Sequence, residues 1–164
     1  MSQAVAGQSE IADAKKPVRR AGLCNAGAIK KAARKISLIY DQALAPTGLK
    51  ITQYGILSAI NSRGAALPTI HELAEELVMD RSTLGQNLRP LERAELVAIL
   101  TDPVDRRNRL IALTKRGLTK LNEAAEYWRT AHDRFEEVLG EPEAAELRAM
   151  LLAIAYHPEF GERG

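Results

Sequence analysis

The chain has 164 residues, of which 46% are hydrophobic, 27% are charged and only 4% are aromatic. This length is enough for one ordinary globular domain with a largely aliphatic core. The single cysteine, Cys24, excludes an intrachain disulfide and favours a reducing compartment. No apolar run approaches the ~18 residues of a membrane span, and the N-terminal stretch lacks the order of a signal peptide. We therefore expect a cytoplasmic protein with no membrane partner.

The formal net charge is only +2, but the charge is distributed unevenly along the chain. Residues 1–35 carry eight basic and two acidic side chains, whereas residues 65–80 carry four acidic ones and no basic one. Residues 81–117 carry eight basic and four acidic side chains, and residues 118–164 carry five basic and ten acidic ones. Such separation of charge predicts that the basic zones meet an anionic partner.

The first part of the chain is expected to be an arm followed by a helix. Residues 1–21 show no hydrophobic periodicity and are rich in small and basic side chains, which predicts a disordered basic arm. Apolar side chains at helical spacing predict a helix that begins at about Asn25. Pro46 and Gly48 are expected to end it.

Two further helices are predicted before residue 80. Thr52 is the expected cap of one helix, which runs through Ile60 and stops at Gly64. The next helix opens with Thr69 and Glu72, which have the T-x-x-E spacing of a capping box. After a short turn at residues 78–80, a fourth helix is expected.

Asp80 is the expected cap of this fourth helix, which runs from Arg81 to about Ala94. Pro90 lies deep inside it and is expected to remove one backbone hydrogen bond and bend the helix. Two short apolar runs follow, Leu96–Thr101 and Leu110–Leu113, and they predict a β-hairpin.

Two helices are predicted to complete the chain. The first runs from Lys115 to about Leu139, and the second spans roughly Glu143 to Tyr156, with Gly140 and Pro142 in the break between them. The inward side chains expected in these helices are Leu118, Leu121, Ala125, Trp128 and Phe135, then Leu147, Leu151 and Ile154. The fold class is therefore mainly α with a small β-hairpin (α+β), and a helix-turn-helix followed directly by a hairpin is a winged helix.

The helix from Arg81 has two different faces. At about 100° per residue, Leu84, Leu88 and Leu91 fall within about 60° of one another and must face the core. The opposite face holds hydrogen-bonding side chains of the kind that contact base edges and phosphates: Ser82, Gln86, Arg89 and Arg93. Gly85 flanks this face, and its lack of a side chain would allow close approach to DNA.

The tip of the predicted hairpin is strongly basic. Arg106 and Arg107 lie where the turn projects, and an arginine on such a tip can enter the narrow minor groove of DNA. Asp105 is expected to hold one of these arginines by a bidentate pair and so fix its direction. A turn that served only solubility would favour Gly, Asn and Ser.

Several stretches resemble the MarR family of transcriptional regulators. The family's wing signature, Asp and arginines followed by Leu-x-x-Leu-Thr-x-x-Gly, is similar to DPVDRRNRLIALTKRG at residues 102–117. The matching residues are Asp105, Arg106, Arg107, Leu110, Leu113, Thr114 and Gly117. The family's helix-turn-helix resembles IHELAEELVMDRSTLGQNLRPLERAELV, and its first helices resemble KKAARKISLIYDQAL and GLKITQYGIL. The resemblance covers roughly residues 22–157.

The resemblance implies a homodimer that binds double-stranded DNA and is not an enzyme. The N- and C-terminal helices of both subunits would interlock, and two recognition helices would reach successive major grooves about 34 Å apart on a pseudo-palindromic operator. We therefore expect dimerisation and linker helices at residues 22–64, the DNA-binding domain at 65–117 and C-terminal dimerisation helices at 118–164. Family members are often repressors that a small phenolic or aromatic acid releases from DNA.

The expected sites follow from these assignments. The side chains expected to contact DNA are Arg81, Ser82, Thr83, Gln86, Asn87, Arg89, Arg93, Asp105, Arg106, Arg107 and Arg109. The side chains expected to bind an effector acid are Arg34, Tyr40, Tyr54 and Arg129, since a buried arginine suits a carboxylate. No cofactor or metal is expected: HELAE at residues 71–75 has Glu75 where a zinc-protease motif needs its second histidine, and no Cys/His cluster suits structural zinc.

Two alternatives remain open at this point. One is a thiol switch at Cys24, as in the peroxide-sensing branch of the family, whose reactive cysteine aligns with Ala26 here. On a helix, Cys24 would face about 200° away from that position, which favours an ordinary thiol. The other is a winged helix that binds protein instead of DNA, against which the basic wing argues.

Overall fold

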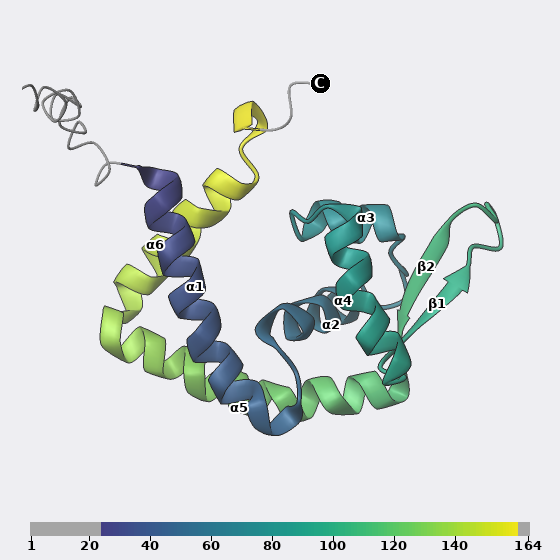
Figure 1. Ribbon diagram of the computed structural model, residues 1–164, viewed down its shortest axis with the longest axis horizontal. Helices are drawn as coiled ribbons and strands as arrows, with labels where there is room; N and C mark the ends of the chain where they lie inside the picture. Colours follow the sequence, from purple (N-terminus) through teal and green to yellow (C-terminus); the bar gives the residue numbers. More distant parts are fainter. Residues whose placement is uncertain (1–23, 161–164) are drawn as a thin grey trace, which may run out of the picture. The chain divides into compact units, whose positions relative to one another are not determined.

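The computed structural model describes residues 24–160, so the expectation for the arm at residues 1–21 lies outside it (Figure 1). The chain forms two units that divide between Ile36 and Ser37. No helix in the described range is both long enough and apolar enough to cross a membrane.

Six α-helices and one two-stranded sheet make up residues 24–160, together with short 3-10 turns at Ala45–Thr47 and Pro158–Phe160. The helices are α1 (Asn25–Leu44), α2 (Ile51–Ser62), α3 (Ile70–Glu76), α4 (Arg81–Arg93), α5 (Lys115–Leu139) and α6 (Glu141–Ala155). The strands are β1 (Val97–Thr101) and β2 (Arg109–Leu113). The predicted fold, a mainly helical winged helix-turn-helix, is confirmed.

The start of α2 differs from the prediction. Thr52 is not the cap, because α2 begins at Ile51 and continues past Ile60 to Ser62. The amide of Ile51 donates to Asp41 Oδ1 of α1 at 2.7 Å, and the amide of Lys50 donates to Gln53 Oε1 at 3.0 Å. A carboxylate from another helix therefore caps α2, and sequence spacing does not reveal such a partner.

The caps of the next two helices are as predicted. Thr69 Oγ1 accepts from the amide of Glu72 at 3.1 Å, and Glu72 Oε2 accepts from the amide of Thr69 at 2.7 Å. Asp80 Oδ1 accepts from the amide of Thr83 at 2.8 Å. The chain turns between α3 and α4 through Val78, whose φ of 51° lies in the left-handed region.

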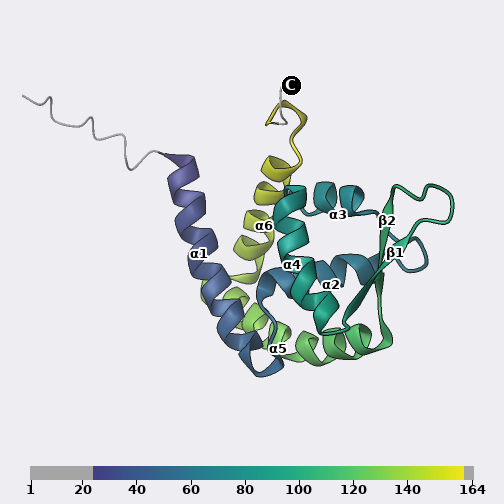
Figure 2. The ribbon, with the colours of Figure 1, turned by 45° about the vertical axis from the view of Figure 1, so that its right-hand side comes forward.

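The wing is an antiparallel hairpin in which Val97 pairs with Leu113 and Thr101 pairs with Arg109. It is attached to the start of α3 by a bridge between Thr69 and Leu110 and by a bond of 2.9 Å from the amide of Ile111 to the carbonyl of Pro68. The hairpin, α3 and α4 lie side by side in both views (Figure 2).

A compact joint connects the wing to α5. Thr114 Oγ1 caps α5 by accepting from the amide of Gly117 at 2.9 Å and donates to the carbonyl of Glu95 at 2.7 Å. The amide of Thr114 donates to the carbonyl of Leu96 at 3.1 Å. Gly117 packs so closely on that same carbonyl that a Cβ at position 117 would collide with it. This packing accounts for the Thr-x-x-Gly spacing.

The core gathers around α4. Leu84, Leu88 and Leu91 are buried, as their angular spacing predicted. They belong to one cluster with side chains from α2, α3, the wing and α5, including Ile56, Leu57, Leu73, Leu96, Val97, Ile111 and Leu121. The opposite face of α4 is thereby left to solvent.

The expected inward faces of α5 and α6 are partly wrong. On α5 the buried positions are Gly117, Leu121, Ala124 and Ala131, whereas Leu118 is exposed. On α6 only Ala144 is buried, and the predicted inward side chains Leu151 and Ile154 are exposed. Pro142 lies in the first turn of α6, where its missing N–H is tolerated, and not in the break before the helix. Leu151 and Ile154 remain exposed because α6 packs mainly against α5 within the chain.

Candidate nucleic-acid interface

The outer face of α4 carries the side chains predicted to read DNA. Ser82, Gln86, Arg89 and Arg93 are all solvent-accessible on this face, and Arg81 is exposed at the start of the helix. Within residues 24–160, the side chains of Arg81, Gln86, Arg89 and Arg93 have no hydrogen-bond or ion-pair partner. Their donors are therefore available to a ligand without loss of an intrachain contact.

The first turn of α4 is already engaged internally. The hydroxyls of Ser82 and Thr83 each donate to Asp80 at 2.6 Å. The Ser82 bond, followed by the bonds from Thr83, holds the pKa of the Asp80 carboxyl well below its usual range. Asn87 donates from Nδ2 to the carbonyl of Thr83 at 2.9 Å. Ser82 and Thr83 can therefore offer DNA only their acceptor lone pairs, a restriction that the sequence did not reveal.

Gly85 leaves open space beside this face. A Cβ at position 85 would meet no heavy atom within 4 Å. Packing within the chain therefore does not require glycine at this position. The open space is consistent with the expected close approach of DNA.

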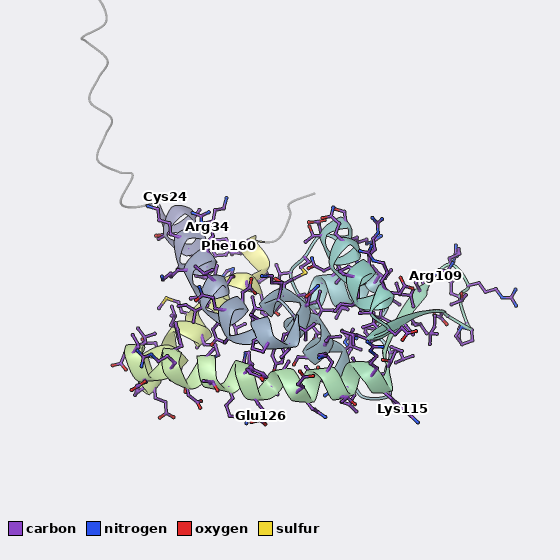
Figure 3. All side chains as sticks on the ribbon, turned by 60° about the horizontal axis from the view of Figure 1, so that its bottom comes forward. Cys24, Arg34, Arg109, Lys115, Glu126 and Phe160 are labelled. Carbon is purple, nitrogen blue, oxygen red and sulfur yellow. The ribbon has the colours of Figure 1, made fainter. Side chains whose placement is uncertain are left out.

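The wing tip holds Arg107 in the way predicted for one of its arginines. Arg107 Nε donates to Asp105 Oδ1 at 3.0 Å, and Nη2 donates to Oδ2 at 3.1 Å. The guanidinium lowers the pKa of the Asp105 carboxyl, and the carboxylate raises the pKa of Arg107. Arg106 is exposed beside this pair. Arg109 lies on β2, where it donates to Thr101 Oγ1 across the hairpin (Figure 3).

A groove of about 260 Å³ brings α4 and the wing together. It is lined by Arg81 at the start of α4, by Arg107 and Arg109 of the wing, and by Thr69, Ile70, His71 and Asn108. The three arginines were predicted separately, and the structure places them around one space. His71 and Asn108 were missed, because contacts between residues distant in sequence, Thr69 with Leu110 and Pro68 with Ile111, bring α3 against β2.

The residues predicted for an effector site fall into different surroundings. Tyr54 stacks on Trp128 with ring centres 5.9 Å apart, and Tyr40 lies 6.4 Å from the same ring. Burial raises the pKa of both tyrosine hydroxyls. Arg129 is exposed and pairs with Glu126 at 3.0 Å, while Arg34 is exposed in the N-terminal unit. The structure therefore brings the two tyrosines together but leaves Arg129 in solvent.

A hollow of about 340 Å³ lies between α4 and α5 and is lined by none of those four residues. Its apolar lining includes Leu49, Leu91 and Leu96. Arg116 and Lys120 of α5 supply positive charge at its edge. Arg116 is ion-paired with Glu95, and Lys120 is ion-paired with Glu123. Ion pairs of this kind contribute little to stability, so either cation can exchange its carboxylate for that of a ligand.

Cys24 is a free, exposed thiol directly before α1, and its Sγ accepts from the amide of Gly27 at 3.4 Å. In the part of the chain that the structure describes, no three His, Cys, Asp or Glu side chains gather as they would around a metal ion.

Residues 47–108 match the model of the MarR family. This segment runs from the turn before α2 to the wing and includes the whole outer face of α4. A curated relative, the uncharacterised HTH-type transcriptional regulator YxaD of Bacillus subtilis, is 35% identical over 102 residues, which are 62% of this chain and 68% of that protein.

Two solved proteins share the fold and have been captured on DNA. The transcriptional regulator MosR of M. tuberculosis in complex with DNA has a TM-score of 0.74 and 29% identity, covering 83% of this chain and 96% of that one. The transcriptional repressor CouR bound to a 23-mer duplex has a TM-score of 0.74 and 26% identity, covering 86% and 99%. CouR from Rhodococcus jostii RHA1 bound to p-coumaroyl-CoA has a TM-score of 0.69 and 26% identity, covering 82% and 93%.

Proposed function

The chain belongs to the MarR family of DNA-binding transcriptional regulators, and we propose that it is a homodimeric repressor that a small aromatic acid releases from its operator. Members of this family are regulators and not enzymes, which agrees with the expectation from the sequence. Within this role, residues 65–117 are the DNA-binding domain, and residues 22–64 and 118–164 serve dimerisation.

Sequence reading is proposed to lie on α4. Gln86 and Arg89 would contact base edges in the major groove, since Gln pairs bidentately with adenine and Arg with guanine. Arg93 would contact a phosphate. The proposal is supported by the exposure of these three side chains and by the absence of any partner for them in residues 24–160. Ser82 and Thr83 would contribute as acceptors, and Asn87 would contribute its Oδ1 and the N–H that its bond to Thr83 leaves free.

The wing is proposed to contact the minor groove through Arg106 and Arg107. Asp105 fixes the guanidinium of Arg107 by two bonds, so that less side-chain freedom is lost when DNA binds. The observation that carries the DNA-binding proposal is the groove that Arg81, Arg107 and Arg109 share, because it joins the reading helix and the wing in one cationic surface.

Dimerisation is proposed to use the exposed apolar face of α6. Large apolar side chains that a monomer would leave in water are concentrated there: Met150, Leu151, Leu152 and Ile154 on the helix, and Tyr156 and Phe160 just beyond it. Several large apolar side chains left exposed on one helix in this way indicate an interaction site. A two-fold dimer would present two copies of α4 to one duplex.

The effector is proposed to be a small aromatic acid. CouR, a protein of similar fold, has been solved with p-coumaroyl-CoA, whose aromatic ring, but not a free carboxylate, is common to the proposed ligand. In this chain the hollow between α4 and α5 would hold the ring among Leu49, Leu91 and Leu96, with the carboxylate at Arg116 and Lys120. The rings of Tyr54 and Tyr40, which both lie beside Trp128, are together with Arg129 the second place proposed for such an acid.

The DNA-binding proposal is tested with Arg107→Ala protein and a duplex from the region upstream of its own gene. We expect weaker binding and a salt dependence (log affinity against log salt) that is shallower by about 0.9, because one cationic side chain no longer releases counterions from the DNA. Arg134→Ala is the matched control, since Arg134 is also an exposed arginine that is paired with a carboxylate, that of Glu137. Equal affinity and an equal slope for Arg107→Ala and wild type would refute the role of the wing.

A further inference from the structure

The groove between the wing and the first turn of α3 contains a titratable side chain, His71, beside its three arginines. His71 belongs to the first turn of α3, which is fixed against the wing by the pairing of Thr69 with Leu110. The imidazole is therefore attached to the same framework that positions Arg107 and Arg109. None of the DNA contacts predicted from the sequence includes it.

Charged groups approach His71 from each element that borders the groove. On α3, Glu75 Oε1 lies 3.5 Å from His71 Nε2, and the hydrogen bonds with Thr69 hold the pKa of the neighbouring Glu72 carboxyl below its usual range. Arg81 comes from α4, and Arg107 and Arg109 come from the wing. Asp105 offsets the charge of Arg107. The groove thus combines fixed positive charge with one side chain whose charge depends on pH.

We propose that this groove seats one phosphate of the DNA backbone and that His71 binds it as an imidazolium, so that DNA binding takes up a proton. The inference rests on the proposed function and deepens it. Histidine is the side chain whose charge ordinarily changes between pH 5 and 8. A protonated ring donates from both nitrogens, so one can remain with Glu75 while the other meets the phosphate.

The sign of the pH dependence follows from this linkage. The DNA-bound form holds a proton that the free protein releases as the pH rises, so affinity increases as the pH falls from 8 to 6. The pKa values of Glu72 and Asp105 are lowered by their hydrogen bonds, away from that range, and arginine side chains stay charged throughout. The change in charge is therefore assigned to the histidine.

The test uses a random-sequence 30-base-pair duplex at low salt, because phosphate contacts do not depend on sequence and no operator is needed. Wild-type protein should bind roughly fivefold more tightly at pH 6 than at pH 8, with a salt slope steeper by about 0.9 at pH 6. His71→Gln should remove both differences. His71→Lys, with a fixed charge, should reach at pH 8 the affinity that wild type shows at pH 6.

His157→Gln is the matched control for the pH effect, because it replaces another exposed histidine, one that lies beyond α6. Its ring packs beside Phe160 of the proposed dimer face, so light scattering first checks that this variant has the oligomeric state of wild type. It should keep the full pH effect of wild type. A pH effect of wild-type size in His71→Gln would overturn the inference while leaving the proposed function intact. If neither wild-type protein nor any of the variants binds the duplex, the proposed function is overturned instead.

A second measurement distinguishes free phosphate from backbone phosphate as the ligand of the groove. The melting temperature of the protein without DNA is measured in sodium phosphate and in sodium chloride of equal ionic strength. No difference between the two salts, together with pH-dependent DNA binding, supports the backbone assignment. A phosphate-specific rise in melting temperature that His71→Gln abolishes, together with pH-independent DNA binding, would assign the groove to the free ion and overturn the proposal.

Discussion

Helices α4 and α6 both carry regularly spaced leucines, but the chain buries these leucines only in α4. In α4, Leu88 is 1% exposed, whereas in α6 Leu151 and Leu152 are 38% and 50% exposed. The difference lies in the neighbours, because α4 packs on α2, α3 and β1 whereas α6 packs mainly on α5. Apolar spacing therefore identifies a face that will be buried, but not the molecule that buries it.

The largest expected effect is a difference in the free energy of unfolding between a leucine variant in α4 and one in α6. Leu88→Ala should reduce the free energy of unfolding by about 2–5 kcal/mol, because it opens a cavity in the core. Leu152→Ala, measured at a protein concentration low enough to keep the chain monomeric, should reduce it by less than about 1 kcal/mol. Urea denaturation of both variants gives the comparison. Equal losses would mean that α6 is packed within its own chain after all.

The second effect concerns assembly. Leu152→Glu should convert the proposed dimer to monomer, because a carboxylate buried at an apolar interface is strongly unfavourable. Size-exclusion chromatography with light scattering measures the mass. Val104→Glu is the control, since Val104 is an apolar side chain that is 94% exposed on the wing, and this variant should remain dimeric. A dimeric Leu152→Glu protein would place the dimer interface elsewhere.

The smallest expected change in stability is at the solvent face of α4. Gly85→Ala should stabilise the protein by up to about 1 kcal/mol, because alanine favours helix more than glycine does. Its added methyl should nevertheless weaken DNA binding by about tenfold, or ~1.4 kcal/mol, if the DNA backbone approaches position 85. Thermal melting and a DNA titration measure the two effects.

Gly55→Ala is the matched variant, since Gly55 also lies in a helix and a methyl group at position 55 would likewise meet no heavy atom within 4 Å. It should gain stability with unchanged DNA affinity. If Gly85→Ala and Gly55→Ala bind DNA equally well, the close approach of DNA to α4 is wrong.

Local signals in the sequence predicted most of the fold. The capping box of Thr69 and Glu72, the cap at Asp80 and the Thr-x-x-Gly of Thr114 each act within four residues, so spacing alone is sufficient to find them. The inward leucines of α4 follow from the helical period in the same way. The bidentate hold of Asp105 on Arg107 is equally local.

What the sequence missed depends on contacts between distant residues. The cap of α2 by Asp41 spans ten positions, and the bridge from Thr69 to Leu110 creates the groove that contains His71. The bond from the Ser82 hydroxyl to Asp80 is local, but it was missed because the same hydroxyl was expected to donate to DNA. A pattern of residue types indicates which groups can bond, and not which of several partners each one takes.

The joint at Gly117 has a mechanical consequence. Because the carbonyl of Leu96 is held by the amide of Thr114 and covered by Gly117, the hairpin is joined to α5 without a flexible linker. A rotation of α5 about its axis would therefore carry the wing with it as one rigid body. Five residues per strand at about 3.4 Å each give an arm of about 17 Å, so a rotation of about 5° in α5 displaces the arginines at the tip by about 1.5 Å. A small twist at the proposed dimer interface would thus be amplified at the minor groove.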